Sequence, residues 1–135
     1  MTPKRVLIVE DDEDLNYLWT DVLSSHGYAV VAVNDGALAL AEIPRFEPDL
    51  ILLDLIMPRA EVDGLALLHR LSASATLAQV PVVVISGLGE SVAAAISPET
   101  AKILGIVAVV HKPVESATLM REIDRAIGEQ HRPVG

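Results

Sequence analysis

Apolar residues in this chain fall into five short runs separated by longer mixed stretches. The runs occupy residues 6–9, 28–33, 50–53, 82–85 and 106–110 and consist almost entirely of Val, Ile, Leu and Ala. Unbroken apolar runs of this length are typical of strands that are buried on both faces of a parallel sheet. The pattern therefore predicts five strands, of which those at residues 6–9 and 50–53 are expected to be buried.

The stretches between these runs carry apolar residues at spacings of three and four, the spacing of one face of a helix. Such stripes are formed by Leu15, Leu18, Trp19, Val22 and Leu23, by Leu65, Leu68 and Leu71, and by Leu119, Met120, Ile123 and Ile127. A further helix rich in Ala and Leu is expected after Gly36, ending before Pro44. Because strands and helices alternate, the sequence predicts an α/β fold, with a parallel sheet between two helical layers in a three-layer α-β-α sandwich.

The connection over residues 88–104 has a helical composition but contains Ser97-Pro98. Ser97 is suited to cap a helix, and Pro98 is suited to its first position. We therefore expect two helical pieces here. One ends near Ile96, and the other covers residues 98–104 and is ended by Gly105.

Composition limits the class of protein. The 135 residues suffice for one domain, and 51% hydrophobic with only 3% aromatic residues predicts an aliphatic core. A net charge of -9 argues against direct binding of nucleic acid, and no apolar run is long enough for a membrane span or a signal peptide. The chain has no cysteine for disulfides or thiol chemistry. We expect a cytoplasmic domain over residues 1–130 and a flexible C-terminal tail over residues 131–135, either standing alone or belonging to a larger protein.

Polar side chains follow four of the predicted strands where those strands leave the core. They are Glu10, Asp11 and Asp12 after the first strand, Asp54 after the third, Ser86 after the fourth and Lys112 after the fifth. In open α/β sheets, ligands bind outside the carboxyl ends of the strands, so these groups converge on one pocket if the four strands are neighbours. Adjacent carboxylates either raise a pKa or hold a hard cation such as Mg²⁺. Lysine and serine suit a phosphoryl group, and a carboxylate can itself be a nucleophile.

Each of these residues also has a purely structural interpretation. Acidic residues before a helix often cap it, and an aspartate such as Asp54 at the end of a strand often forms a turn. Ser86 or Lys112 alone is equally uninformative. Only their joint occurrence, each at the carboxyl end of its own strand, favours a functional site. The histidines His26, His69, His111 and His131 lack the spacing of metal ligands.

In combination, these motifs resemble the receiver domain of two-component response regulators. They are Val9-Glu10-Asp11-Asp12, Leu53-Asp54 with Met57-Pro58, Asp63-Gly64, Ser86 and Lys112-Pro113, so the resemblance covers nearly the whole chain. It implies a flavodoxin-like fold with five strands in the order 2-1-3-4-5. It also implies Mg²⁺-dependent phosphoryl transfer to Asp54 from a histidine kinase or a histidine phosphotransfer protein, which would switch binding of a downstream protein target. Such a domain is a phosphoprotein rather than an enzyme, with at most slow self-phosphorylation and self-dephosphorylation.

The resemblance also implies the ligands of the metal. Asp11 would bind Mg²⁺, or Mn²⁺ in its place, directly, and Glu10 would act mainly through water. Asp54 and the main-chain carbonyl of Ile56 would complete the protein ligands, and Asp12 is a secondary candidate.

The remaining site residues would contact the phosphoryl group. The resemblance implies that Ser86 and Lys112 bind its oxygens, and that the peptide bond between Lys112 and Pro113 is cis.

The sequence departs from the family pattern in three places. The loop over residues 59–62 is longer than usual, and so is the spacing between Ser86 and Lys112. Val109 stands where the family commonly has Tyr or Phe, the aromatic that changes rotamer on activation. Because Val109 is short and stiff, one hypothesis is that phosphorylation shifts residues 87–96 as a unit instead. The alternative is that this stretch is a surface insertion without a role in signalling.

The side chains that flank the approach of water in the family are Ile56 and Leu88 in this chain. Neither can hydrogen-bond a water molecule, so self-dephosphorylation is expected to be slow.

Three other classes of protein fit the sequence less well. A phosphatase of the haloacid dehalogenase kind needs an acid two residues after the nucleophile, where this chain has Ile56. A flavodoxin needs a loop rich in Ser, Thr or Gly after the first strand, and here that loop is acidic. A receiver-shaped interaction module that is not regulated by phosphorylation stays open, although Asp54, Ser86 and Lys112 together argue against it.

Overall fold

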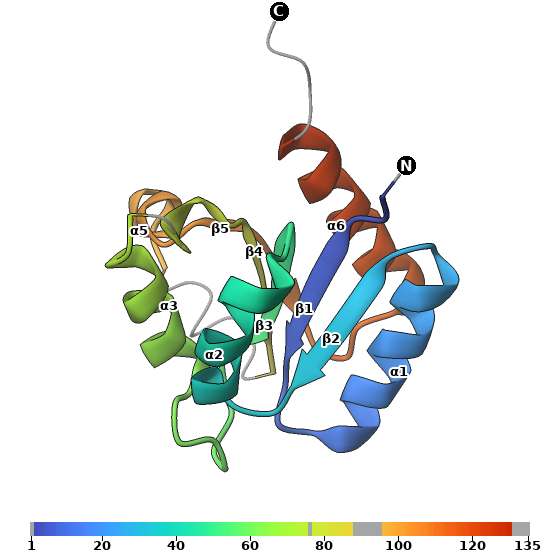
Figure 1. Ribbon diagram of the computed structural model, residues 1–135, viewed down its shortest axis with the longest axis horizontal. Coiled ribbons are helices and arrows are strands. Elements are labelled where there is room, and N and C mark those ends of the chain that lie inside the picture. The colour runs from blue at the N-terminus through green and yellow to red at the C-terminus, as the bar shows by residue number, and fades with distance from the viewer. Residues whose placement is uncertain (1, 76, 88–95, 131–135) are drawn as a thin grey trace, which may run out of the picture.

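The five predicted strands form one parallel sheet. The computed structural model describes residues 2–75, 77–87 and 96–130. Its strands are β1 (Arg5–Val9), β2 (Ala29–Val33), β3 (Leu50–Asp54), β4 (Val82–Ser86) and β5 (Ile106–His111). They are arranged in the order β2-β1-β3-β4-β5 (Figure 1). The α/β class and the strand order implied by the resemblance are therefore confirmed.

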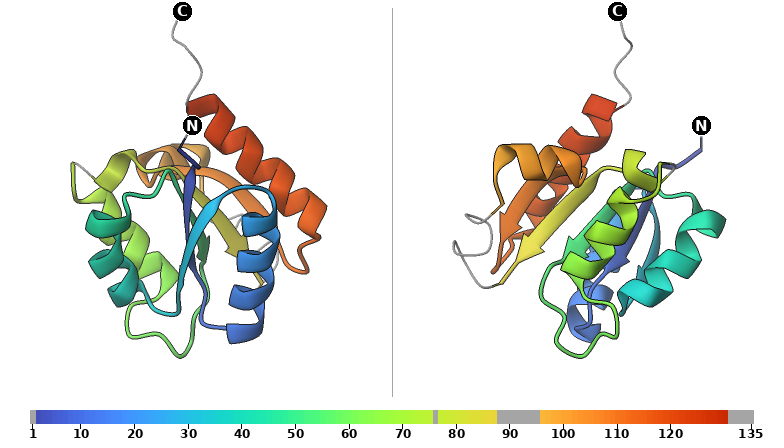
Figure 2. Two further views of the ribbon diagram at one scale, coloured as in Figure 1. Left: turned by 45° about the vertical axis from the view of Figure 1, so that its right-hand side comes forward. Right: turned by 90° about the vertical axis from the view of Figure 1, so that its left-hand side faces the viewer.

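Helices cover both faces of the sheet (Figures 1 and 2). They are α1 (Glu13–Ser25), α2 (Gly36–Phe46), α3 (Gly64–Ser72), α5 (Pro98–Ile103) and α6 (Ser116–Gln130), with a short 3-10 helix η1 (Leu77–Gln79) before β4. The buried apolar residues form two clusters, one with α1 and α6 and the other with α2, α3 and the end of α5. Leu50 and Leu52 of β3 belong to the first cluster, and Ile51 and Leu53 belong to the second, as the period of two along a strand requires.

Strand β3 lies at the centre of the sheet. It pairs with β1 on one side and with β4 on the other, and all five of its residues are buried. This central place explains why the run is apolar throughout. It also means that Asp54, its last residue, is buried although it is charged.

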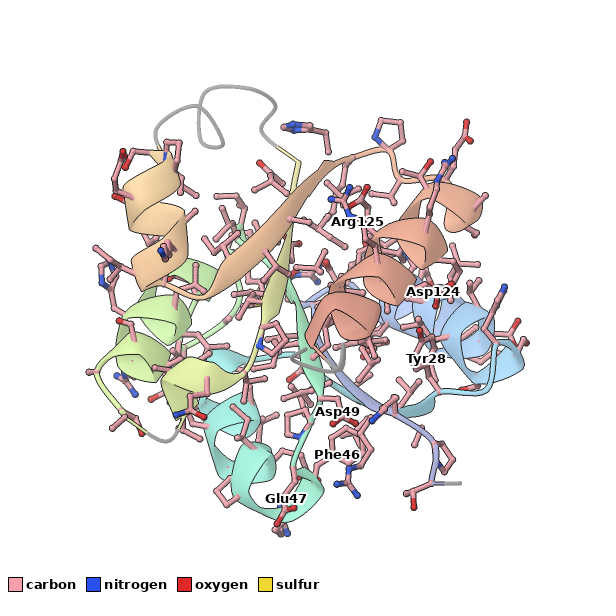
Figure 3. All side chains as sticks on the ribbon, turned by 90° about the horizontal axis from the view of Figure 1, so that it is seen from above. Tyr28, Phe46, Glu47, Asp49, Asp124 and Arg125 are labelled. Carbon is pink, nitrogen blue, oxygen red and sulfur yellow. The ribbon has the colours of Figure 1, made fainter. Side chains whose placement is uncertain are left out.

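Contacts between remote segments secure the end of the sheet opposite the predicted site. The Tyr28 hydroxyl, just before β2, donates a hydrogen bond to Asp124 Oδ1 on α6 (Figure 3). Burial raises the pKa of Tyr28, and this hydrogen bond and the charge of Asp124 raise it further. The Arg5 main-chain N–H donates to Asp49 Oδ2 at 2.7 Å. These contacts tie the starts of β1 and β2 to the rest of the domain.

The expected end of the second helix before Pro44 is wrong. Helix α2 continues to Phe46 with Pro44 inside it, and Glu47 ends it in a left-handed conformation with its N–H bonded to Ile43 O at 2.9 Å. Proline removes one helical hydrogen bond. The helix nevertheless extends past Pro44 because Ile43 is buried and Phe46 packs against the same apolar cluster.

The predicted helix start at Ser97 is confirmed. Ser97 accepts the Thr100 N–H at 3.1 Å, Pro98 is the first helical residue, and Gly105 follows with a φ of 75°. The first piece expected in this connection, and with it Leu88, lies outside the described residues, as does the tail over residues 131–135. Among the helices that the structure describes, none has the length and apolar character needed to cross a membrane.

Candidate functional site

The site forms where β1, β3, β4 and β5 end. Glu10 follows β1, Asp54 ends β3, Ser86 ends β4, and Lys112 follows β5. The strands are parallel and adjacent, so their carboxyl ends lie at one edge. Hydrogen bonds continue past that edge, because the N–H of Lys112 donates to Ser86 O at 2.9 Å. The predicted convergence of these residues is therefore present in the structure.

Three carboxylates gather at this edge. Oxygens of Glu10, Asp11 and Asp54 lie within 4.8 Å of one another, and Glu10 and Asp54 are only 1% and 2% exposed. Burial raises the pKa of Glu10 to about 8, and the hydrogen bond and like charge of Asp54 contribute to the rise. Lys112 and the N–H of Asp12 act in the opposite direction. A set of this kind, with two carboxylates buried and Asp11 partly exposed, suits a hard divalent cation that takes carboxylate oxygens as ligands.

Lys112 is the cation that balances these charges. Its Nζ lies 2.9 Å from Asp54 Oδ2 and 3.5 Å from Glu10 Oε2. Burial would lower the pKa of Lys112, but the hydrogen bonds and charges of Asp54 and Glu10 outweigh it, so the pKa is raised. Lys112 therefore carries its positive charge at neutral pH and holds it against Asp54.

The carboxylate of Asp54 is oriented from both sides. Its Oδ1 accepts the main-chain N–H of Ile56 at 3.0 Å, and its Oδ2 accepts from Lys112. The chain behind it is fixed by a close approach of α3, because a Cβ on Gly64 would lie 2.4 Å from Asp54 O and 2.6 Å from Leu55 Cα. Only glycine fits there, which gives the Asp63-Gly64 motif a packing role beside the site.

Ser86 contributes a hydroxyl without a partner. Its side chain is fully buried, and among the residues that the structure describes none hydrogen-bonds its Oγ. Buried polar atoms are usually paired. An unpaired hydroxyl beside Asp54 and Lys112 is therefore available to a ligand oxygen.

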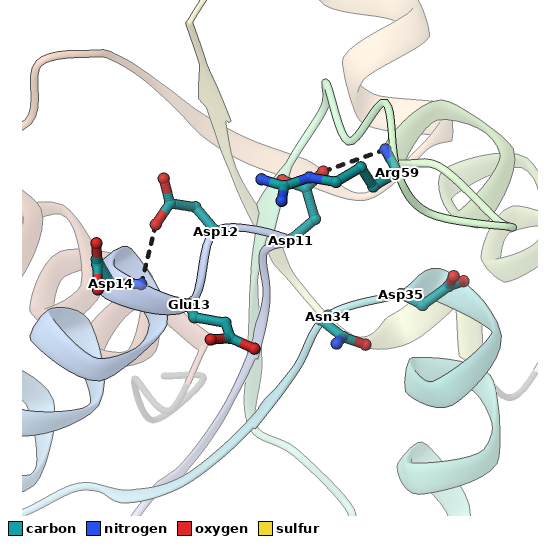
Figure 4. A pocket seen from close by; sticks show the side chains of 7 residues that line it. All are labelled: Asp11, Asp12, Glu13, Asp14, Asn34, Asp35 and Arg59. Carbon is teal, nitrogen blue, oxygen red and sulfur yellow. Dashed lines mark hydrogen bonds between the residues drawn. The ribbon is translucent and has the colours of Figure 1, made fainter.

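Asp12 is not part of the carboxylate set. Its Oδ1 accepts the N–H groups of Asp14 and Leu15 at 2.9 and 3.1 Å, so it caps α1. Asp11 points the other way and accepts the Arg59 N–H at 3.4 Å (Figure 4). The peptide bond between Lys112 and Pro113 is cis, as the resemblance implied.

The role of Asp35 did not follow from its sequence context, which indicates only a turn. Its carboxylate caps α2 through the N–H of Ala37 at 2.9 Å and also accepts the N–H groups of Glu61 and Val62. The Ala37 N–H lowers the pKa of Asp35, burial opposes this, and the other two N–H groups add to the lowering. Asp35 thus joins the loop over residues 59–62 to α2.

Comparison with known proteins identifies the family. The sequence model of the response regulator receiver domain matches residues 6–124, and the chain belongs to this family. A protein-glutamate methylesterase/protein-glutamine glutaminase 5 of Myxococcus xanthus is 39% identical over 120 residues, which are 87% of this chain and 32% of that protein. The nitrogen assimilation regulatory protein NtrX of Azorhizobium caulinodans is 32% identical over 96% of this chain and 31% of its own length. The chain thus spans about a third of these curated relatives.

Solved structures agree with this assignment. The signal receiver domain of a signal transduction histidine kinase from Syntrophus aciditrophicus superposes with a TM-score of 0.82 at 26% identity, covering 98% of this chain and 96% of that one. NtrX from Brucella abortus gives a TM-score of 0.81 at 30% identity, covering 95% of this chain and 27% of that one. The chain is a receiver domain of two-component signalling.

Proposed function

We propose that the domain accepts a phosphoryl group on Asp54 from the phosphohistidine of a histidine kinase or a histidine phosphotransfer protein. The phosphorylated form would bind a downstream protein target differently from the free form. One observation carries the proposal. Asp54 is a buried carboxylate held by Lys112, with two further carboxylates on one side and the unpaired Ser86 hydroxyl at the same edge.

The transfer needs no other nucleophile. A carboxylate oxygen of Asp54 forms a bond to phosphorus while the P–N bond to the donor imidazole breaks. The electron pair of that bond stays on the imidazole nitrogen, which takes up a proton from solvent. The N–H of Ile56 and the ammonium of Lys112 hold the Asp54 carboxylate, so its orientation is set before the donor arrives.

The donor set fits a magnesium ion, with manganese as an alternative. Asp11 and Asp54 would be ligands, Glu10 would act mainly through water, and the main-chain carbonyl of Ile56 would complete the set. A bound Mg²⁺ would neutralise charge on the transferring phosphoryl group. The high pKa of Glu10 supports the fit, because three close carboxylates without a cation favour holding a proton.

Ser86 and Lys112 would bind the phosphoryl oxygens after transfer. The Ser86 hydroxyl has no hydrogen-bond partner among the described residues, and Lys112 is already in contact with the Asp54 carboxylate. Each would supply a hydrogen bond to a phosphoryl oxygen, charge-assisted in the case of Lys112.

The proposal concerns a phosphoryl acceptor and not a hydrolase. Ile56 lies two residues after Asp54, where an aspartate phosphatase needs an acid. The methylesterase and glutaminase named for the relatives belong to proteins about three times as long, and those activities are not proposed for this domain. We propose that it acts in the cytoplasm, through protein partners rather than through nucleic acid or a membrane.

Intact mass spectrometry after incubation with acetyl phosphate and Mg²⁺ tests the proposal. Wild type should gain one phosphoryl group, and this gain should disappear with EDTA or in Asp54→Asn. Asp63→Asn is the matched control, because Asp63 caps α3 outside the carboxylate set and asparagine also caps helices well. Equal labelling of wild type and Asp54→Asn would overturn the assignment. An unlabelled wild type would favour an interaction module that is not regulated by phosphorylation.

A further inference from the structure

The loop over residues 59–62 is a fixed wall of the site. Its last residue, Val62, is buried in the apolar cluster of α2 and α3, and Ala60 N–H donates to Met57 O at 3.0 Å. Asp35 accepts two of the loop's N–H groups, and Gly36 N–H donates to Val62 O at 2.8 Å. The loop also lies flat on the start of α2, because a Cβ on Gly36 would come within 2.6 Å of Val62 O.

This wall places Arg59 beside Asp11, the one member of the carboxylate set that is not fully buried, and we call the cleft around these two residues the entrance. The Arg59 N–H donates to Asp11 Oδ2 at 3.4 Å, and the side chain extends across Asp11 toward the acidic residues that begin α1 (Figure 4). The cleft here has a volume of about 440 Å³ and is lined by Asp11, Asp12, Glu13, Asp14, Asn34, Asp35 and Arg59. Among these described lining residues, Arg59 is the only cation, and five are carboxylates.

Charge at this entrance opposes the approach of a phosphoryl donor. Small phosphodonors are anions, and like charges in a cleft lower their local concentration. Lys112 lies deeper and is already paired with Asp54 and Glu10, so it offsets the outer carboxylates poorly. A guanidinium is well suited to reduce this repulsion, because it stays charged at every relevant pH and presents a planar fork to phosphate oxygens.

We propose that Arg59 is a specificity-determining residue, which favours phosphodonors of higher net negative charge by offsetting the repulsion of the carboxylates at this entrance. This inference rests on the proposed function. It makes the longer loop a selectivity device rather than a neutral insertion.

Phosphodonors of different net charge distinguish an electrostatic role of Arg59 from a purely structural one. With acetyl phosphate, the Asp54 oxygen bonds to phosphorus as the P–O bond breaks and acetate leaves with the electron pair. With phosphoramidate, the P–N bond breaks and the nitrogen, already protonated, leaves as ammonia. Near pH 7.5 acetyl phosphate is a dianion and phosphoramidate a monoanion, so loss of Arg59 should affect the first donor more strongly.

The experiment measures second-order rates of labelling by intact mass spectrometry with Mg²⁺ at low salt. For Arg59→Gln we expect a fall of about fivefold with acetyl phosphate and about twofold with phosphoramidate, the effect of one unit charge about 8 Å from the donor in water. Arg59→Lys should recover most of the loss. At about 1 M salt, where the Debye length is about 3 Å, the difference between donors should largely vanish.

Arg70→Gln is the matched control. It removes an equal charge from an exposed position on α3 and should leave both rates unchanged. Equal rates in wild type and Arg59→Gln, or equal losses with both donors, would overturn the role of Arg59 while leaving Asp54 as the acceptor. Wild type that accepts phosphate from neither donor would overturn the proposed function, and this inference with it.

Discussion

Replacing Glu10 by Gln should change how the stability of the metal-free protein depends on pH. The pKa of Glu10 is raised from 4.5 to about 8 in the folded protein, so between these values the folded state holds a proton that the unfolded chain has released. Raising the pH through this window therefore favours the unfolded chain, and the free energy of unfolding falls. Above the folded pKa both states are ionised and the slope ends.

The size of this loss in unfolding free energy follows from the uptake of one proton by Glu10 in the folded state. The slope is at most about 1.4 kcal/mol per pH unit, so the Glu10 carboxyl should cost about 2 kcal/mol of stability between pH 5.5 and 7.5. Glutamine does not titrate but can still accept the Asp12 N–H that Glu10 accepts at 3.1 Å. The Glu10→Gln variant should therefore lack this part of the pH dependence.

Urea unfolding in EDTA, followed by the fluorescence of Trp19, measures this difference. Trp19 is the only tryptophan and is 3% exposed, so its emission reports unfolding directly. For each protein, the change in unfolding free energy between pH 5.5 and pH 7.5 is measured. The change in the variant is then subtracted from the change in wild type. A difference of zero, or a wild type that gains stability relative to the variant as pH rises, would refute the ionisation behaviour assigned to Glu10.

Two further predictions concern the packing of the site and the lifetime of its product. Gly64→Ala should lower the free energy of unfolding by about 1–3 kcal/mol in urea titrations, because the new Cβ meets the backbone of Asp54 and Leu55. Gly128→Ala in α6, where a Cβ meets nothing within 4 Å, should instead raise it by about 0.5–1 kcal/mol, and a loss in both variants would contradict the steric argument. Ile56→Asn should shorten the life of the phosphorylated form several-fold, because an amide beside Asp54 can hydrogen-bond an attacking water. Leu38→Asn, at a similarly exposed apolar residue on α2, should leave the lifetime unchanged, and decay measured by intact mass at the wild-type rate in Ile56→Asn would argue against side-chain control there.

Much of the fold follows from local sequence. Unbroken apolar runs locate all five strands. For β1, β3 and β4 the reason is that a strand covered on both faces needs an apolar residue at nearly every position, whereas the edge strands β2 and β5 are only partly buried. Ser97 and Gly105 mark a helix start and end through hydrogen bonds and a φ angle that involve only near neighbours. The extent of α2 was mispredicted because the burial of Ile43 and Phe46, which local sequence does not report, outweighs the cost of Pro44.

The candidate site likewise has a part that the sequence predicts and a part that only the tertiary structure decides. Glu10, Asp54, Ser86 and Lys112 could be predicted together, because the carboxyl ends of neighbouring parallel strands must meet at one edge. The strand pattern does not distinguish which of the adjacent acids turns inward, whereas the resemblance to receiver domains placed Asp11 before Asp12. In the structure Asp11 joins the carboxylates and Asp12 caps α1.

The position of the loop over residues 59–62 is determined by the tertiary structure alone. Asp35 accepts N–H groups from residues 26 and 27 positions away, and through them it places Arg59 over Asp11. Asp35 has the same local signature as any helix cap, so nothing near it in the sequence distinguishes the second role. The distinction arises because a carboxylate has more than one free lone pair, and only the folded chain determines which distant donors reach them.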